Sequence, residues 1–140
     1  ATLITNGFKI FSGGTDTHLM LVDLRPFNVK GNLAAESLSR ANITCNKNGI
    51  PFDSESPMIT SGIRLGSQAA TTRGFGLKEF EKVGELITKV IDGLSKNPND
   101  NSKVEDEIRK EVVSLCSSFP IYKNLRKWFV QFAKKEKLQL

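Results

Sequence analysis

The chain has 140 residues, of which 39% are hydrophobic and 25% charged, and its formal net charge is +5. This size fits one globular domain with its own core, and no apolar run reaches the roughly 20 residues that a membrane span needs. Two cysteines exclude a disulfide framework, and a single histidine excludes a metal site built on two histidines. We therefore expect a cytosolic, reduced setting, with no metal site and no membrane as partner. Because residue 1 is alanine and no signal-peptide pattern follows, we also expect the chain to begin partway through a longer protein.

The first third of the chain predicts strands and one helix. Residues 8–11 alternate in polarity, residues 12–16 form a turn, and residues 18–24 are apolar enough for a central strand covered on both faces. A helix follows, predicted by apolar residues at helical spacing: Leu33, Ala34, Leu38 and Ala41. Asn32 is its expected N-cap, and residues 43–45 are expected to form another short strand.

The rest of the chain predicts an exposed loop over residues 49–60, a strand over 63–65, a turn region over 71–76, and then helices. One apolar stripe consists of Leu77, Phe80, Val83, Ile87, Val90, Ile91 and Leu94. A second consists of Val104, Ile108, Val112, Leu115 and Phe119. Ser102 and Glu105 fit a capping box at the start of the second helix. The predicted class is α+β, with three or four short strands and helices packed on one face of the sheet.

The positive charge is concentrated at the end of the chain. Residues 123–140 hold six Lys or Arg against one Glu, so residues 1–122 are neutral overall. Apolar residues at helical spacing (Leu125, Trp128, Phe129 and Phe132) predict a basic amphipathic helix there. Such a helix can contact nucleic acid or an anionic membrane, but docking on its own protein or a partner subunit is favoured. We therefore divide the chain into a domain over residues 1–122 and a basic amphipathic tail over residues 123–140.

Arg64 is the most informative single residue, because it lies on a short apolar strand between two glycines. A guanidinium carries a fixed charge and five donors, so it needs an anionic partner. One reading is the bidentate binding of a ligand carboxylate. The other is an ordinary ion pair with an Asp or Glu of the same chain, and residue chemistry alone favours this second reading.

Residue chemistry leaves other positions open. Asn48, next to Lys47, follows a predicted strand, and its amide suits either the edge of a heterocyclic ligand or the backbone of its own turn. The loop around Ser56, Pro57 and Met58 either lines a ligand or is only solvated. His18 is more readily explained as a structural residue than as a general base.

Four runs of sequence resemble the serine hydroxymethyltransferase family in order and spacing. They are SGGTDTHLMLVDL at 12–24, RANITCNKN at 40–48, SPMITSGIRLG at 56–66 and TTRGF at 71–75. The match covers residues 8–122 and is similar to the bacterial type. It implies the small antiparallel sheet of the C-terminal domain of fold-type I pyridoxal phosphate enzymes, with helices on one face.

The resemblance also implies roles for particular residues. Arg64 matches the residue that binds the carboxylate of the amino-acid substrate. Asn48 matches a residue that contacts the pterin ring of folate. Ser56, Pro57 and Met58 match a folate-contacting segment, in which Met58 replaces the usual phenylalanine.

The implied activity is that of glycine hydroxymethyltransferase, which interconverts serine and glycine with pyridoxal phosphate as cofactor and tetrahydrofolate as one-carbon carrier. The lysine that holds the cofactor belongs to the family's large domain, so no catalytic residue is expected in this chain, and the isolated chain is expected to be inactive. A homodimer is implied for the full-length protein. The alternative hypothesis is a non-catalytic binding module of the same fold, whose basic tail contacts RNA, membrane or protein.

Overall fold

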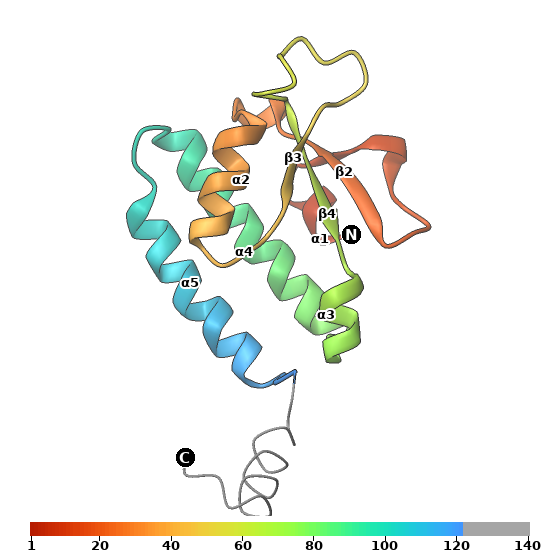
Figure 1. Cartoon of the computed structure of the whole chain (residues 1–140), viewed down its shortest axis with the longest axis vertical. Coiled ribbons are helices and arrows are strands. Elements are labelled where there is room, and N and C mark those ends of the chain that lie inside the picture. The colour runs from red at the N-terminus through yellow and green to blue at the C-terminus, as the bar shows by residue number, and fades with distance from the viewer. Residues whose placement is uncertain (122–140) are drawn as a thin grey trace, which may run out of the picture.

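The computed structural model describes residues 1–121, in which short strands form one antiparallel sheet of order β1-β2-β4-β3 (Figure 1). The strands are β1 (Lys9–Ile10), β2 (Leu19–Asp23), β3 (Asn46–Asn48) and β4 (Gly62–Gly66). The α-helices are α1 (Thr2–Thr5), α2 (Gly31–Arg40), α3 (Gln68–Arg73), α4 (Leu77–Lys96) and α5 (Ser102–Ser117). Two 3-10 turns, η1 (Phe11–Gly13) and η2 (Arg25–Phe27), flank β2. The predicted α+β class is confirmed.

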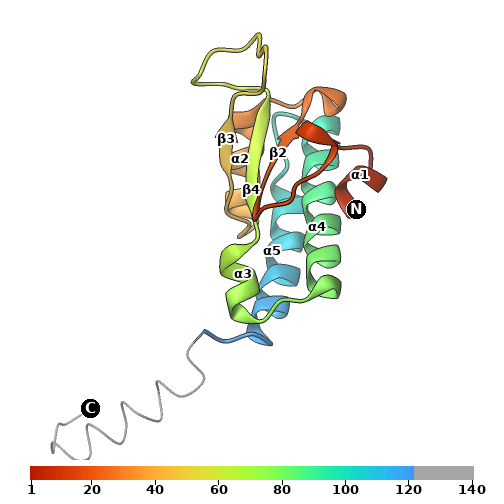
Figure 2. The same cartoon turned by 90° about the vertical axis from the view of Figure 1, so that its right-hand side faces the viewer.

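The long helices cover one face of the sheet, as Figure 2 shows for α2, α4 and α5. Alternation along β4 explains this layering, because Ile63 and Leu65 are buried while Arg64 and Gly66 are exposed. The core between sheet and helices includes Val22, Leu38, Ile63, Leu86 and Ile91, each of them fully buried. The opposite face of the sheet carries no helix within residues 1–121.

The expectation that the strand at residues 18–24 is covered on both faces is wrong. Val22 is fully buried, but Leu19 is 38% exposed and Leu21 is only half-buried. The register pairs Leu21 with Arg64 and Leu19 with Gly66, so these leucines lie on the face that carries no helix. An apolar run therefore marked a central strand correctly, but only one of its faces packs against the core.

Two boundaries also differ from prediction. The strand predicted over residues 43–45 is not formed, and β3 begins only at Asn46, while the Ile43 N–H donates to the Leu38 carbonyl at 2.8 Å and closes the end of α2. Residues 71–76, predicted as a turn, include the end of α3. That helix ends at Arg73 and is followed by Gly74, whose φ of +102° lies in the left-handed region that glycine tolerates.

The predicted helix caps are wrong as well. Lys30, not Asn32, holds the N-cap position of α2, and no side chain caps that helix. Instead the N–H groups of Gly31 and Asn32 donate to the carbonyls of Thr60 and Ile59, both at 2.9 Å. The loop before β4 thus supplies the acceptors that the first turn of a helix lacks.

Glu105, predicted to cap α5, instead links α5 to α2. Its carboxylate is buried, accepts a hydrogen bond from the Ser37 hydroxyl at 2.6 Å, and pairs with the Arg40 guanidinium at 2.6 Å. Asn101 holds the N-cap position of α5, and its amide donates to the Ser37 hydroxyl and to the Val90 carbonyl. A polar cluster therefore fixes the packing of the helices beneath the sheet. The predicted amphipathic tail lies outside the described residues.

Candidate functional site

The candidate site lies on the sheet face that carries no helix. Arg64 projects from β4 onto this face, where the register places Asn46 of β3 on one side and Leu21 of β2 on the other. Directly opposed residues of an antiparallel pair have Cβ atoms about 5 Å apart, so Asn46 and Arg64 are neighbours. The position of Arg64 follows from the alternation that buries Ile63 and Leu65 on the reverse face.

The Arg64 side chain is exposed and makes no ion pair within residues 1–121. The ordinary ion pair that residue chemistry favoured is therefore not formed in the described part of the chain. The carboxylate of Asp23 lies on the same face, but it pairs with Arg25, whose Nη2 approaches it to 2.7 Å. Arg64 thus presents its donors to solvent, where an external carboxylate can accept them in pairs.

Asn48 lies on the same face as Arg64, two residues after Asn46 on β3. It opposes Gly62, which places it diagonally across from Arg64, about 7–8 Å away by the usual spacing of such pairs. Its Nδ2 donates to the Gly49 carbonyl at 2.7 Å. The amide therefore serves its own turn, while its Oδ1 retains acceptor capacity for a ligand.

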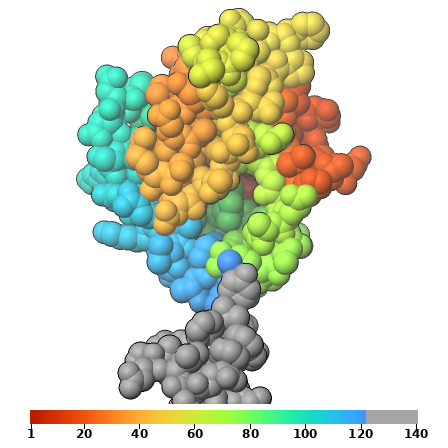
Figure 3. All heavy atoms as spheres, viewed as in Figure 1, coloured from red at the N-terminus to blue at the C-terminus, as the bar shows by residue number. Residues whose placement is uncertain are grey.

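Ser56, Pro57 and Met58 lie in the loop between β3 and β4, which stands beyond the end of the sheet (Figure 1) and forms the upper end of the surface in Figure 3. All three are exposed, and Met58 keeps 73% of its surface accessible. The Ser56 carbonyl accepts hydrogen bonds from the N–H groups of Ile59 and Thr60, both at 3.0 Å. These bonds hold the three residues in a tight turn.

Sequence reasoning missed Asp53, which organises this loop. Its carboxylate accepts hydrogen bonds from the N–H groups of Ile50, Glu55 and Ser61 and from the Ser61 hydroxyl. The Ser61 hydroxyl, followed by the backbone donors, holds the pKa of Asp53 well below its usual range. The signal was present in the sequence, because an Asp in a loop commonly accepts a hydrogen bond from the backbone N–H two residues on, as Asp53 does from Glu55.

Two lysines fasten the same loop. The Lys47 ammonium donates to the Met58 carbonyl, and Lys30 pairs with Glu55. Lys47 opposes Ile63 of the core, so it extends from the face of the sheet opposite to Arg64. It therefore belongs to the support of the loop and does not share a face with Asn48.

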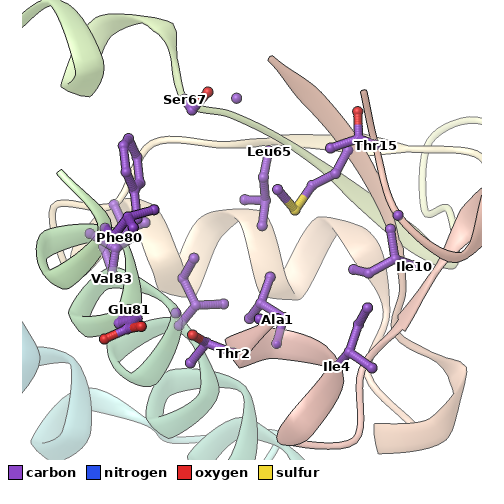
Figure 4. Close-up of a pocket in the computed structure, with 18 of the residues that line it drawn as sticks. Ala1, Thr2, Ile4, Ile10, Thr15, Leu65, Ser67, Phe80, Glu81 and Val83 are labelled. Atoms are coloured by element: carbon purple, nitrogen blue, oxygen red, sulfur yellow. The ribbon is translucent and has the colours of Figure 1, made fainter. Parts of the chain in front are cut away.

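A separate cavity of about 560 Å³ lies at the other end of the sheet, between α1, β4 and α4. Figure 4 shows side chains from these elements around it, among them Ile4, Leu65, Phe80 and Val83. None of the predicted site residues lines this cavity. Its mainly apolar walls also lack the cluster of charged groups that an amino acid would require.

The described residues do not fit pyridoxal phosphate. The cofactor needs a lysine for its Schiff base, and Lys47, the lysine on the strand that pairs with β4, is held on the other face by the Met58 carbonyl. Residues 1–121 contain no group of three or more His, Cys, Asp or Glu side chains placed to hold a metal ion. Among the helices of the same residues, none has the length and apolar character that crossing a bilayer requires.

Comparison with known proteins identifies relatives of one kind. The sequence model of the serine hydroxymethyltransferase family matches residues 1–87. A serine hydroxymethyltransferase from Pelagibacter ubique is 83% identical over 125 residues, which cover 89% of this chain and 29% of that protein. Those from Paramagnetospirillum magneticum and Marinomonas are 64% and 60% identical over 121 residues, covering 86% of this chain and 28% of each relative. The chain thus spans less than a third of the length of these relatives, and it belongs to the serine hydroxymethyltransferase family.

Proposed function

We propose that this chain is the part of a serine hydroxymethyltransferase that binds the substrate carboxylate and tetrahydrofolate. The whole protein would act as a glycine hydroxymethyltransferase, interconverting serine and glycine with tetrahydrofolate as one-carbon carrier. The observation that carries the proposal is Arg64, an exposed guanidinium on the helix-free sheet face with no carboxylate partner in residues 1–121. Membership of the family makes the amino-acid substrate the expected anion.

Arg64 would orient the substrate by gripping its carboxylate with two parallel hydrogen bonds. Fixing the carboxylate fixes the direction of the bonds at the neighbouring carbon, which reduces the entropy lost on reaching the transition state. The strand supports this task, because Arg64 stands on a β-strand whose reverse face is locked in the core by Ile63 and Leu65. A side chain on such a rigid element keeps its direction better than one on a loop.

Folate would lie beside the amino acid, against Asn48 and the exposed turn formed by Ser56, Pro57 and Met58. The shared face of Asn48 and Arg64 supports this arrangement, since it allows two ligands to be held side by side. Met58 offers a flexible thioether where an aromatic ring would stack, so its contact with a pterin ring would rest on dispersion and sulfur–aromatic attraction.

Pyridoxal phosphate, as an electron sink, would supply the carbanion chemistry, and it would be held by the remainder of the protein. The described residues contribute substrate contacts only, and a homodimer of the full-length protein, in a cytosolic setting, is part of the same proposal. We expect the 140-residue chain alone, supplied with cofactor, serine and tetrahydrofolate, to show no turnover. Product formation at the rate of an intact enzyme would contradict this assignment.

The carboxylate contact is tested by Arg64→Lys in the intact protein that contains this sequence. An ammonium cannot form the bidentate pair, so we expect kcat/KM for serine to fall roughly 30- to 100-fold. Arg109→Lys is the matched control, because Arg109 is exposed on α5 and pairs with Asp106 away from the sheet. An unchanged KM for serine in the Arg64 variant would refute the assignment.

A further inference from the structure

The loop between β3 and β4 is closed by one carboxylate. Oδ2 of Asp53 accepts hydrogen bonds from the N–H groups of Ile50, at 3.1 Å, and Ser61, at 2.9 Å. Oδ1 accepts from the N–H of Glu55, at 3.0 Å, and from the Ser61 hydroxyl, at 2.6 Å. Asp53 therefore joins the residue that begins the loop to the residue that leads into β4.

The turn with the predicted folate contacts, residues 56–58, lies inside the span that Asp53 closes. The Lys47 ammonium donates to the Met58 carbonyl of this turn, and Lys30 forms an ion pair with Glu55, the residue just before the turn. On the far side, the carbonyls of Ile59 and Thr60 are fixed by the first N–H groups of α2. The turn is thus held by contacts to the residue before it, to Met58 within it and to the two residues after it.

Little of this order serves the core, because Ile50 is the one large apolar side chain of residues 50–61 that is buried. Phe52 is fully exposed, and Ser56, Pro57 and Met58 are exposed as well, so the fastened segment buries little apolar surface. Fixing backbone costs conformational entropy, which a loop that only connects two strands has no need to lose. Backbone order without burial is what a binding segment needs, because a ligand then meets the loop in its final shape.

We propose that Asp53 is a positioning residue for tetrahydrofolate. Its carboxylate does not touch the ligand, but it holds residues 56–58 in the conformation that binds. This inference rests on the proposed folate role of the loop and adds to it a residue that the resemblance did not assign. Arg64 lies on β4, whose other face is packed in the core, so loss of the Asp53 hydrogen bonds leaves the binding of serine intact.

The experiment is steady-state kinetics of the intact protein with Asp53→Asn. The NH₂ group of the new asparagine cannot accept hydrogen bonds, so the loop loses the bonds that one oxygen of Asp53 accepts. We therefore expect KM for tetrahydrofolate to rise roughly tenfold. KM for serine should stay within roughly twofold of the unsubstituted protein, because its contact lies on the sheet. Asp92→Asn on α4 removes the same charge away from the loop and is the control. Ser61→Ala removes only the hydroxyl donor and should give a smaller rise, which keeps the test open if the Asn variant does not fold.

Asn48→Ala separates this inference from the function on which it rests. A rise in KM for tetrahydrofolate in the Asn48, Asp53 and Ser61 variants, with Asp92→Asn unchanged, supports the positioning role. A rise for Asn48→Ala alone overturns it and leaves the folate site standing. No rise in any variant overturns both. Equal rises for folate and serine in Asp53→Asn and Ser61→Ala also overturn the inference, because they indicate general damage to the fold.

Discussion

Replacing Gly31 by alanine should destabilise the fold, although Gly31 is the first residue of helix α2. Helix propensity alone predicts the opposite, since alanine is favoured over glycine by about 1 kcal/mol inside a helix. The lack of space around Gly31 outweighs this difference in helix propensity. A Cβ at this position would stand 2.1 Å from the Thr60 Oγ1 and 2.5 Å from the Gly62 carbonyl oxygen. The hydroxyl can rotate away, but the carbonyl belongs to the backbone of β4 and cannot.

The loop must therefore move away from α2 in the variant. This motion breaks the two hydrogen bonds by which Gly31 and Asn32 donate to the carbonyls of Thr60 and Ile59. The two N–H groups left without partners alone cost about 2–4 kcal/mol, which exceeds the gain in helix propensity. The net loss should be at least about 1 kcal/mol, measured as a lower midpoint of equilibrium unfolding in urea at unchanged slope.

Gly49→Ala is the matched control for this prediction, because Gly49 lies in the loop between β3 and β4, the loop that packs against Gly31. Its added Cβ would meet only the Asp53 Oδ2, at 3.8 Å, which is an ordinary contact. We expect the unfolding midpoint of this variant to stay close to that of the unsubstituted chain. If Gly31→Ala were as stable as the control, or more stable, the loop would not be docked on α2 as described.

Two further predictions concern titratable groups. The Arg40 guanidinium holds the pKa of Glu105 below its ordinary value, so this carboxylate stabilises the fold fully above its unfolded-state pKa of about 4.3 and loses that contribution as pH falls through the lower folded-state value. Glu105→Gln should lower stability near neutral pH by about 1–3 kcal/mol and flatten the acid limb of a plot of unfolding free energy against pH; an unchanged acid limb would contradict this. Burial raises the pKa of the Cys45 thiol to about 11, so the native chain should react with iodoacetamide at this residue at least roughly tenfold more slowly than the urea-unfolded chain. Equal rates at Cys45, read by peptide mass spectrometry, would contradict that burial.

The elements with strong periodicity were predictable from the sequence. The stripe from Phe80 to Leu94 forms the buried face of α4, and the alternation around Arg64 forms β4. These patterns follow from the repeat of each backbone, because a helix or strand with one buried face must place apolar residues at a fixed spacing. Leu77, at the start of the first stripe, is 85% exposed, since the first turn of α4 extends beyond the packed part of the helix.

The errors lie where a distant residue competes with a local signal. Ser102 and Glu105 have the spacing of a capping box, but the carboxylate turns inward to Ser37 and Arg40, which are more than 60 positions away in the sequence. Asn32 has the chemistry of an N-cap, but backbone carbonyls from the later loop take that role. A sequence pattern cannot weigh such partners, because their approach depends on the finished packing of the domain.

The candidate site shows the same division. Arg64 could be singled out from the sequence because a guanidinium between glycines on an apolar strand is unusual. That it forms no ion pair within residues 1–121 could not be predicted, since this depends on where the carboxylates of the fold come to lie. Asp23, on the same sheet face, is one example, because its carboxylate pairs with Arg25 at the start of η2.

The position of Arg64 depends on packing on the other face of its own strand. A shift of β4 by one residue would exchange the faces, burying Arg64 and exposing Ile63 and Leu65. Gly62 guards against that shift, because a Cβ there would stand 2.7 Å from the Val22 carbonyl and 2.5 Å from the Ile50 side chain. Only glycine permits this close approach of β4 to β2, and a residue with a side chain at the same register could not occupy the place. The close contact at Gly62 therefore keeps the core face and the face that carries Arg64 in register together, so a substitution there should impair folding and, under the function proposed above, the binding of serine as well.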